Sequence, residues 1–380
     1  MRVPDDIPVL TDGVVTLRAS RPEDADGVYE QCTDPVTQQL TTVPAPYTRQ
    51  HAEDFLARRR AKWEDGSDWG FSIEADGGAE PSSFGGSISV RQLAPGLAEV
   101  AYGAHPAVRG KGVMTRALRL ICDWAFEAKQ IQTMVWQARA GNLASWRAAW
   151  RNGFTFEGSM RAAMPQRGAL VDGWRARLLS TDTHEPKTRW LETPRLAGHN
   201  VVLRPLEATD EERCLETTND PAAVHWLTIV PTFPHDADAF RQTLLDKPLG
   251  SSLGRSVTWA MADPDDGRYL GTINLFGIGG MDYASAEFGY WAHPDARGRG
   301  VTTEAVRLVT AHAFTSAEQG GLGLERVSLG AAEGNIGSQR VARAAGFTET
   351  GHNRHSYDLP DGSVVDMVLF DLLKSELRHS

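Results

Sequence analysis

The sequence predicts a protein of two tandem α/β domains, each built on a mixed sheet, and three observations lead to this prediction. The chain has 380 residues, about twice the length of a typical single domain. Stretches with the alternating apolar pattern of strands are interleaved with stretches of helical periodicity, which is typical of α/β folds. The second half of the sequence repeats the first in the same order and at nearly constant spacing.

The repeat is clearest where HPAVRGKGVMTRALRLICDWAF (His105–Phe126) is followed 188 residues later by HPDARGRGVTTEAVRLVTAHAF (His293–Phe314). These segments share 12 of 22 residues. AEVAYGAHP and GNLASWRAAWRNGF in the first half likewise match AEFGYWAHP and GNIGSQRVARAAGF in the second. A period of this length exceeds any solenoid unit, so the pattern indicates a duplicated domain.

We place the two domains at residues 1–185 and 186–380, with the boundary near Pro186. The connecting stretch there is polar, contains two prolines and shows little periodicity. Because the connection is short, we expect the two domains to pack on each other.

Each copy is expected to contain the same series of strands and helices. In the first copy we expect strands at Val14–Leu17, Trp69–Ile73, Gly86–Val90, Glu99–Tyr102 and Thr133–Gln137, then two closing strands, with helices within 21–32, from Met114 and at Leu143–Arg151. In the second we expect strands at Val201–Leu203, Val257–Met261, Gly271–Leu275, Glu287–Tyr290 and Arg326–Leu329, again with two closing strands, and helices within 207–218, following Val301 and at Ile336–Ala344. Proline-rich turns are expected at Pro44–Pro46 and Pro231–Pro234.

Composition and charge argue against several classes of function. A net charge of −10 argues against nonspecific binding of nucleic acid. No apolar run approaches the ~18 residues of a membrane span, and the N-terminal residues lack a signal pattern, so a cytoplasmic protein without membrane contact is expected. Cysteine and histidine spacings match no ligand set, so no metal is expected.

The strongest chemical signal is a glycine loop before the long helix of each copy. The loops read RGKGV, Arg109–Val113, and RGRGV, Arg297–Val301. Glycines at a strand–helix junction expose backbone N–H groups beside the positive end of the helix dipole. This arrangement favours phosphate, although the spacing matches neither a P-loop nor a dinucleotide fingerprint.

With the N-x-x-S segment and the Gly-Phe ending of the next helix, this pattern resembles the GNAT superfamily of acyl-CoA-dependent N-acyltransferases. The branch most similar to it is that of the ribosomal-protein N-terminal acetyltransferases and their relatives. The resemblance implies a GNAT fold in each copy, acetyl-CoA as cosubstrate, and a splayed strand pair that receives its pantetheine arm.

The resemblance also implies which residues bind the cosubstrate, and they fall at equivalent positions in both copies. They are Tyr102, Arg109, Gly110, Lys111, Gly112, Val113, Met114 and Asn142 in the first copy, and Tyr290, Arg297, Gly298, Arg299, Gly300, Val301, Thr302 and Asn335 in the second. Met114 and Thr302 stand where the family has Gly or Ala, and only the second copy keeps the family's T-E-A phrase, at Glu304. We therefore expect the second site to suit CoA better.

Acyl transfer to an amine needs a base, donors for the carbonyl oxygen and help for the leaving thiolate. Glu99 and Glu287 stand where some family members carry a base, although each is also explained as a structural strand-end residue. The family's common tyrosine acid is replaced by alanine. Ser145 and Ser338, three residues after the asparagines, could assist the thiolate, or could serve only to cap or pack their helices.

These observations predict an acetyl-CoA-dependent N-acetyltransferase in which a primary amine attacks the thioester directly. Its acceptor is expected to be a small-molecule amine or a peptide N-terminus, because deprotonating a lysine at pH 7 costs roughly 5 kcal/mol and an α-amino group roughly 1.4. The alternative is a CoA-binding or sensing protein in which one or both copies are catalytically inactive.

Overall fold

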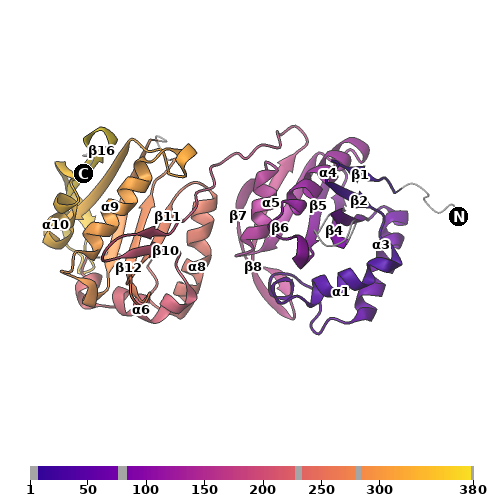
Figure 1. Ribbon diagram of the computed structural model, residues 1–380, viewed down its shortest axis with the longest axis horizontal. Coiled ribbons are helices and arrows are strands. Elements are labelled where there is room, and N and C mark those ends of the chain that lie inside the picture. The colour runs from indigo at the N-terminus through magenta and orange to yellow at the C-terminus, as the bar shows by residue number, and fades with distance from the viewer. Residues whose placement is uncertain (1–6, 76–83, 227–232, 280–283, 378–380) are drawn as a thin grey trace. The chain divides into compact units, whose positions relative to one another are not determined.

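The structure is a computed structural model that describes residues 7–75, 84–226, 233–279 and 284–377 (Figure 1). It divides into two compact units, Met1–Lys187 and Thr188–Ser380. Each unit holds one eight-stranded mixed sheet with helices on both faces, which confirms the predicted fold class.

Strand order is the same in the two sheets. The first sheet runs β1-β2-β3-β4-β5-β6-β8-β7 and the second β9-β10-β11-β12-β13-β14-β16-β15. All neighbours are antiparallel except β5–β6 and β13–β14. The strands of the first sheet are β1 Leu10–Thr11, β2 Val15–Arg18, β3 Asp68–Ala75, β4 Phe84–Ala94, β5 Leu97–Ala104, β6 Thr133–Arg139, β7 Thr155–Gln166 and β8 Ala169–Leu179. Those of the second are β9 Leu196–Ala197, β10 Val202–Arg204, β11 Val257–Ala262, β12 Tyr269–Phe276, β13 Ser285–Ala292, β14 Arg326–Ala332, β15 Thr348–Asp358 and β16 Val364–Leu373.

The helices also correspond one to one. In the first copy they are α1 Ala25–Thr33, α2 Pro35–Leu40, α3 Arg49–Asp65, α4 Val113–Ala128 and α5 Leu143–Arg151. In the second they are α6 Glu211–Thr218, α7 Pro221–Val224, α8 Ala237–Ser252, α9 Val301–Phe314 and α10 Ile336–Ala344. The bounds of α5 and α10 match those expected from the sequence. Helices α3 and α8 lie where no helix was expected, and part of the second proline-rich turn, at 231–232, lies outside the described residues.

Short helices α2 and α7 begin in the same way. Asp34 and Asp220 are their N-caps, each accepting a hydrogen bond from a backbone N–H of the first turn, and each is followed by proline at the first helical position. Proline is well tolerated there because its missing N–H would have had no partner within the helix. An Asp-Pro pair therefore starts both helices.

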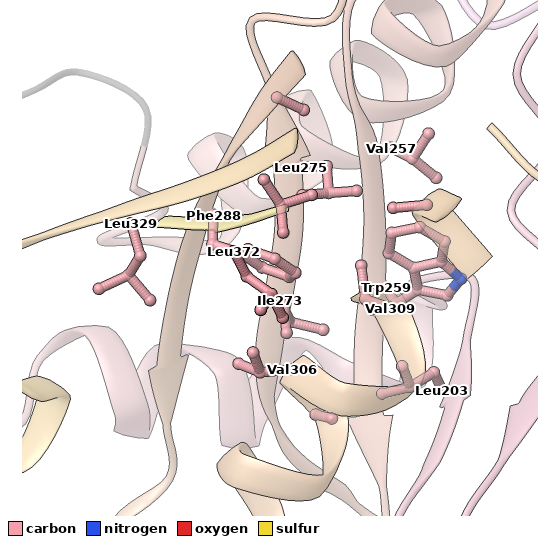
Figure 2. Close-up of a cluster of buried hydrophobic side chains, with 14 of the residues drawn as sticks. Leu203, Val257, Trp259, Ile273, Leu275, Phe288, Val306, Val309, Leu329 and Leu372 are labelled. Atoms are coloured by element: carbon pink, nitrogen blue, oxygen red, sulfur yellow. The ribbon is translucent and has the colours of Figure 1, made fainter. Parts of the chain in front are cut away.

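The core of the second copy shows which helices cover which face of its sheet. Trp259, Met261 and Ile273 belong to one cluster together with the apolar face of α9, part of which Figure 2 shows. Ala260, between two of these strand residues, belongs to a different cluster with Cys214 of α6 and Phe240 of α8. Side chains alternate between the faces of a strand, so α9 covers one face and α6 and α8 cover the other.

In each copy a glycine shapes the strand that pairs with the one leading into the glycine loop; this strand is β4 in the first copy and β12 in the second. Gly86 and Gly271 lie beside irregularities in the strand register, with φ of 135° and 149°. A β-carbon on Gly271 would lie 2.4 Å from the carbonyl oxygen of Trp291, and one on Gly86 would lie 2.3 Å from that of Gly103. Only glycine lets the neighbouring strand come this close.

We expect Gly271→Ala to lower the free energy of unfolding by about 2–4 kcal/mol, since it combines backbone strain with a steric clash. Gly267→Ala is the matched control, because Gly267 has a φ of 75° but open space around it. The control should lose only about 1 kcal/mol. Urea unfolding followed by tryptophan fluorescence measures both, and equal losses would contradict the proposed clash.

Candidate active site

In each sheet the single parallel strand pair separates part-way along its length. Pairing of β5 with β6 ends at Val100 and Trp136, although β5 continues to Ala104 and β6 to Arg139. In the second copy β13 and β14 pair only from Ser285 to Phe288. Among the described residues, the backbone groups beyond these points have no partner strand across the gap, and unpaired groups of this kind can hydrogen-bond to a ligand.

The glycine loop follows the separated strand and opens the long helix. Gly112 and Gly300 are the N-caps of α4 and α9, with φ of 76° and 77° and no side-chain cap. Gly110 and Gly298 also have positive φ, and a β-carbon on any of the four would have no heavy atom within 4 Å. The loop therefore leaves open space over the first-turn amides, where an anion is favoured.

The arginines that precede these glycines hold the loop in place. Arg109 forms an ion pair with Asp34 at 2.6 Å and also donates to Thr37. Arg297 pairs with Asp220 at 2.7 Å. The guanidinium groups lower the pKa of both carboxyls. The predicted cosubstrate arginines therefore attach the short helix of each copy to its glycine loop, through aspartates that the sequence analysis did not identify.

Asparagine, serine and tyrosine meet at the gap between the strands. The side-chain oxygens of Asn142 and Asn335 cap α5 and α10 by accepting from the N–H of Ser145 and Ser338 at 3.2 and 3.0 Å. The Tyr290 hydroxyl lies 2.9 Å from Ser338 Oγ. Burial raises the pKa of Tyr290 to about 12, so its hydroxyl keeps its proton at neutral pH.

The first copy reaches a similar arrangement with a different donor. Trp136 Nε1 donates to Ser145 Oγ at 3.0 Å, and the Tyr102 hydroxyl donates to the Ser145 carbonyl oxygen at 2.8 Å. Burial raises the pKa of Tyr102 above its ordinary value. An indole N–H only donates, so Ser145 Oγ is the acceptor in this contact.

The two predicted base residues have different surroundings. Glu99 lies opposite Arg91 in the strand register, and the two form an ion pair at 3.8 Å. Glu287 lies opposite Phe276 instead, and burial raises the pKa of its carboxyl. No ion pair involves Glu287 among the described residues. The second carboxyl is therefore the one whose affinity for protons is increased by burial.

The T-E-A position has a structural role. Glu304 accepts hydrogen bonds from the backbone N–H of His199 and Asn200 at 2.5 and 2.8 Å. Arg116 takes the same position in the first copy and pairs with Asp12 at 2.8 Å. Both side chains fasten the turn before the second strand to the long helix. In the second copy a groove of about 550 Å³ runs along α9 beside this contact, lined in part by Gly300 and Arg307.

Comparison with known families decides the assignment. The family model of the acetyltransferase (GNAT) domain matches residues 15–155 and again 200–348. The chain belongs to the GNAT acetyltransferase family. Each match contains the separated strands, the glycine loop and the asparagine–serine pair of its copy.

Curated relatives are named as N-acetyltransferases and are about half the length of this chain. The "Probable N-acetyltransferase YjcK" of Bacillus subtilis is 30% identical over 158 residues, covering 41% of this chain and 84% of the relative. The "Putative ribosomal N-acetyltransferase YdaF" of the same organism is 30% identical over 183 residues, covering 47% of this chain and 94% of the relative. These names support the assignment of the chain as an acyltransferase enzyme.

Solved structures similar to the chain include RimL, a ribosomal-protein alpha-N-acetyltransferase in complex with coenzyme A. It is 19% identical, with a TM-score of 0.41 over 45% of this chain and 98% of that chain. A structure described as a probable acetyltransferase is 28% identical, with a TM-score of 0.42 over 49% of this chain and 99% of that chain. In the part of this GNAT chain that the structure describes, no helix has the length and apolar character of a membrane span.

We expect Asn335→Ala to destabilise the second GNAT copy by about 1 kcal/mol, because it leaves the N–H of Ser338 without its cap. Asn335→Asp, which keeps a capping oxygen, should retain most of that stability. Thermal unfolding of the two variants beside the parent protein makes the comparison. Equal melting temperatures for the alanine variant and the parent would contradict the capping role.

Proposed function

We propose that this protein transfers an acetyl group from acetyl-CoA to a primary amine, either a small-molecule amine or a peptide N-terminus. The observation that carries the proposal is the coincidence, in both copies, of an uncapped glycine loop with a gap between parallel strands. A ligand bound by the loop and extended along the gap would end at Ser145 in the first copy or at Ser338 in the second.

The residues present fit coenzyme A. The four loop glycines leave room for a pyrophosphate above the helix N-termini, where a β-carbon would point into open space. Gly298–Thr302 and Gly110–Met114 would provide the amides, with the charges of Arg299 and Lys111 nearby. Acetyl-CoA supplies the acetyl group as a thioester, activated for attack by an amine.

The remaining roles follow from the placement of side chains around the gap. Backbone N–H groups near Tyr290 and Trp291 would stabilise charge on the carbonyl oxygen. Ser338 can accept from the protonated Tyr290 and donate its own proton toward a leaving thiolate. Glu287 would take the proton from the amine, because burial raises the affinity of its carboxylate for protons.

The acceptor class has support from chemistry and from one relative. Both amines are largely protonated at pH 7. The pKa of an α-amino group lies only about one unit above this pH, whereas the pKa of a lysine amine lies more than three units above it. The name of YdaF describes a ribosomal N-acetyltransferase. Release of free CoA thiol should be measured with Ala-Ala-Ala amide, spermidine, free amino acids and aminoglycosides as acceptors. No amine-dependent release from any of these classes would contradict the proposed function.

Gly300→Val should weaken CoA binding at the second copy by at least about tenfold, since valine both resists positive φ and covers the loop amides. Titration calorimetry should then show one tight CoA site per chain in place of two. Gly320→Val is the matched control, because Gly320 has a φ of 84° in an open loop of the same copy. Two unchanged sites in a folded Gly300→Val protein would contradict the loop assignment.

Glu287→Gln should lower kcat by about a hundredfold, within the range of a general base. Only the ionised carboxylate accepts a proton, and the pKa of Glu287 is raised. Activity of the parent protein should therefore fall as pH decreases through this raised pKa, at a higher pH than an exposed glutamate would give. The glutamine variant should lack this acidic limb. Identical pH–rate profiles for the two proteins would remove Glu287 as the base.

A further inference from the structure

Strand alternation places Glu287 on the face of its sheet opposite the glycine-loop helix. Ala286 and Phe288 lie in the cluster beneath α9, so Glu287, between them, points to the face covered by α6 and α8. Trp291 confirms this direction, since its indole donates to the hydroxyl of Tyr269, which belongs to the cluster of α6 and α8. A ligand held by the loop of α9 leaves this opposite face for the second substrate.

An amide oxygen without a partner accompanies Glu287 on that face. Ile273 and Leu275 point toward α9, which leaves Asn274 and Phe276 on the side of Glu287. Asn274 is opposite Gly289, and its Oδ1 is buried without a hydrogen-bond partner. A β-carbon on Gly289 would lie 2.7 Å from this oxygen. Two oxygen acceptors, a carboxylate and an amide, therefore lie at diagonal positions on neighbouring strands, close to the point where β13 and β14 separate.

The equivalent face of the first copy is occupied by the protein's own groups. Asn274 corresponds to Ser89 and Phe276 to Arg91, which already neutralises Glu99. Gly103 takes the place of Trp291, and the buried Gln31 side chain of α1 lies against it, with Nε2 2.6 Å from the position of a β-carbon. A cationic amine finds no uncompensated carboxylate at this position.

The short helix over the gap is also fastened differently in the two copies. In the first copy α2 is held at its start by Arg109, and three further side chains donate to the carbonyl oxygens at its end. These are Arg139 to Gln39, Gln166 to Gln39 and Thr41, and Arg167 to Gln38. They extend from the end of β6 and from the β7–β8 turn, so α2 is tied across the end of the strand gap.

None of these three donors has an equivalent in the second copy. The corresponding positions hold Ala332, Pro360 and Asp361, none of which carries a side-chain N–H donor. There the Tyr357 hydroxyl donates to the carbonyl oxygen of Trp226, just after α7. In the first copy these hydrogen bonds hold the end of α2, whereas among the described residues of the second copy the end of α7 is held there by Tyr357.

We propose that acetyl transfer takes place in the second copy, where Asn274 and Glu287 receive the acceptor amine, and that the first copy binds CoA without transferring its acyl group. The proposal rests on the proposed function and assigns its acceptor site to one copy. In the transfer step the amine nitrogen bonds to the acetyl carbon as the carbon–sulfur bond breaks. Glu287 takes the amine proton, and the sulfur leaves as CoA thiolate, to which the Ser338 hydroxyl can donate a hydrogen bond.

The full-length chain tests this with Ala-Ala-Ala amide and spermidine as acceptors and thiol release as the readout. Asn274→Ser introduces the residue of the first copy and should raise KM for the amine about tenfold, with kcat within about twofold, as expected for a lost hydrogen bond to a charged group. Ser89→Ala is the matched control and should leave KM and kcat unchanged. An unchanged KM in Asn274→Ser, or an equal rise in Ser89→Ala, would overturn the acceptor site.

The Glu287→Gln variant measures how much of the total acetyl transfer the first copy contributes. Total transfer should fall below about one-tenth of the parent rate, because two equally active copies would leave about half. A residual at or above one-tenth, in a protein whose melting temperature is unchanged, would overturn the division between copies. CoA calorimetry of the parent should give two sites per chain, and a single site would overturn CoA binding by the first copy. Absence of turnover in the parent would instead contradict the proposed function itself.

Discussion

Each sheet is organised around the point at which its one parallel strand pair stops. Beyond Val100 and Phe288 the backbone on one side has lost its partner strand, and unpaired peptide groups in a protein interior require another partner. The surrounding elements are arranged about this gap. The glycine loop at the end of the gap begins the long helix, and the helix that carries Ser145 or Ser338 lies beside the gap. On the adjacent strand, Gly86 or Gly271 lets two strands approach closely. A cosubstrate with amide groups of its own can provide the missing hydrogen bonds.

Duplication explains why the two copies share this frame and differ in what surrounds it. The separated strands, the loop glycines, the Asp-Pro helix start and the Asn–Ser cap are common to both. Differences on the face away from the glycine-loop helix include Arg91 against Phe276 and Ser89 against Asn274. Retention of the scaffold together with divergence of one face is what independent specialisation of two linked sites would produce.

Much of the fold could be predicted from the sequence, because most elements carry a local signal. The alternation of β5 and the apolar stripe of α4 each identify an element without tertiary information, and α5 follows a capping asparagine. Helix α3 gave no such signal, since it is polar on almost all sides and buries only Ala52 and Arg59. Its Arg59 donates to the carbonyl oxygens of Phe71 and Ile88, which are strand contacts that no local pattern reveals. Helix α8 contains Pro248, which ordinarily argues against a helix interior.

The candidate site could be predicted in outline but not in its contacts. Glycine, asparagine and serine positions followed from motifs, whereas the partners of Arg109 and Arg297 lie on α2 and α7, far away in the sequence. The difference between Glu99 and Glu287 arises from the residue opposite each on a neighbouring strand, which requires the register. Tertiary pairing, rather than residue identity, distinguishes the two carboxylates.

The contact between the long helix and the turn before the second strand has opposite polarity in the two copies. Arg116 meets the carboxylate of Asp12, whereas Glu304 meets the backbone N–H groups of His199 and Asn200. In each contact the two partners lie about a hundred positions apart in the sequence. The helix residue is inside the most similar stretch of the repeat, and the turn residue is outside it. Recombination between the two halves of the gene within that stretch would place Glu304 against Asp12, two like charges in contact. The charge at this position of the long helix is therefore matched to the turn of its own copy, and exchanging Arg116 and Glu304 between the copies would remove a favourable contact from each.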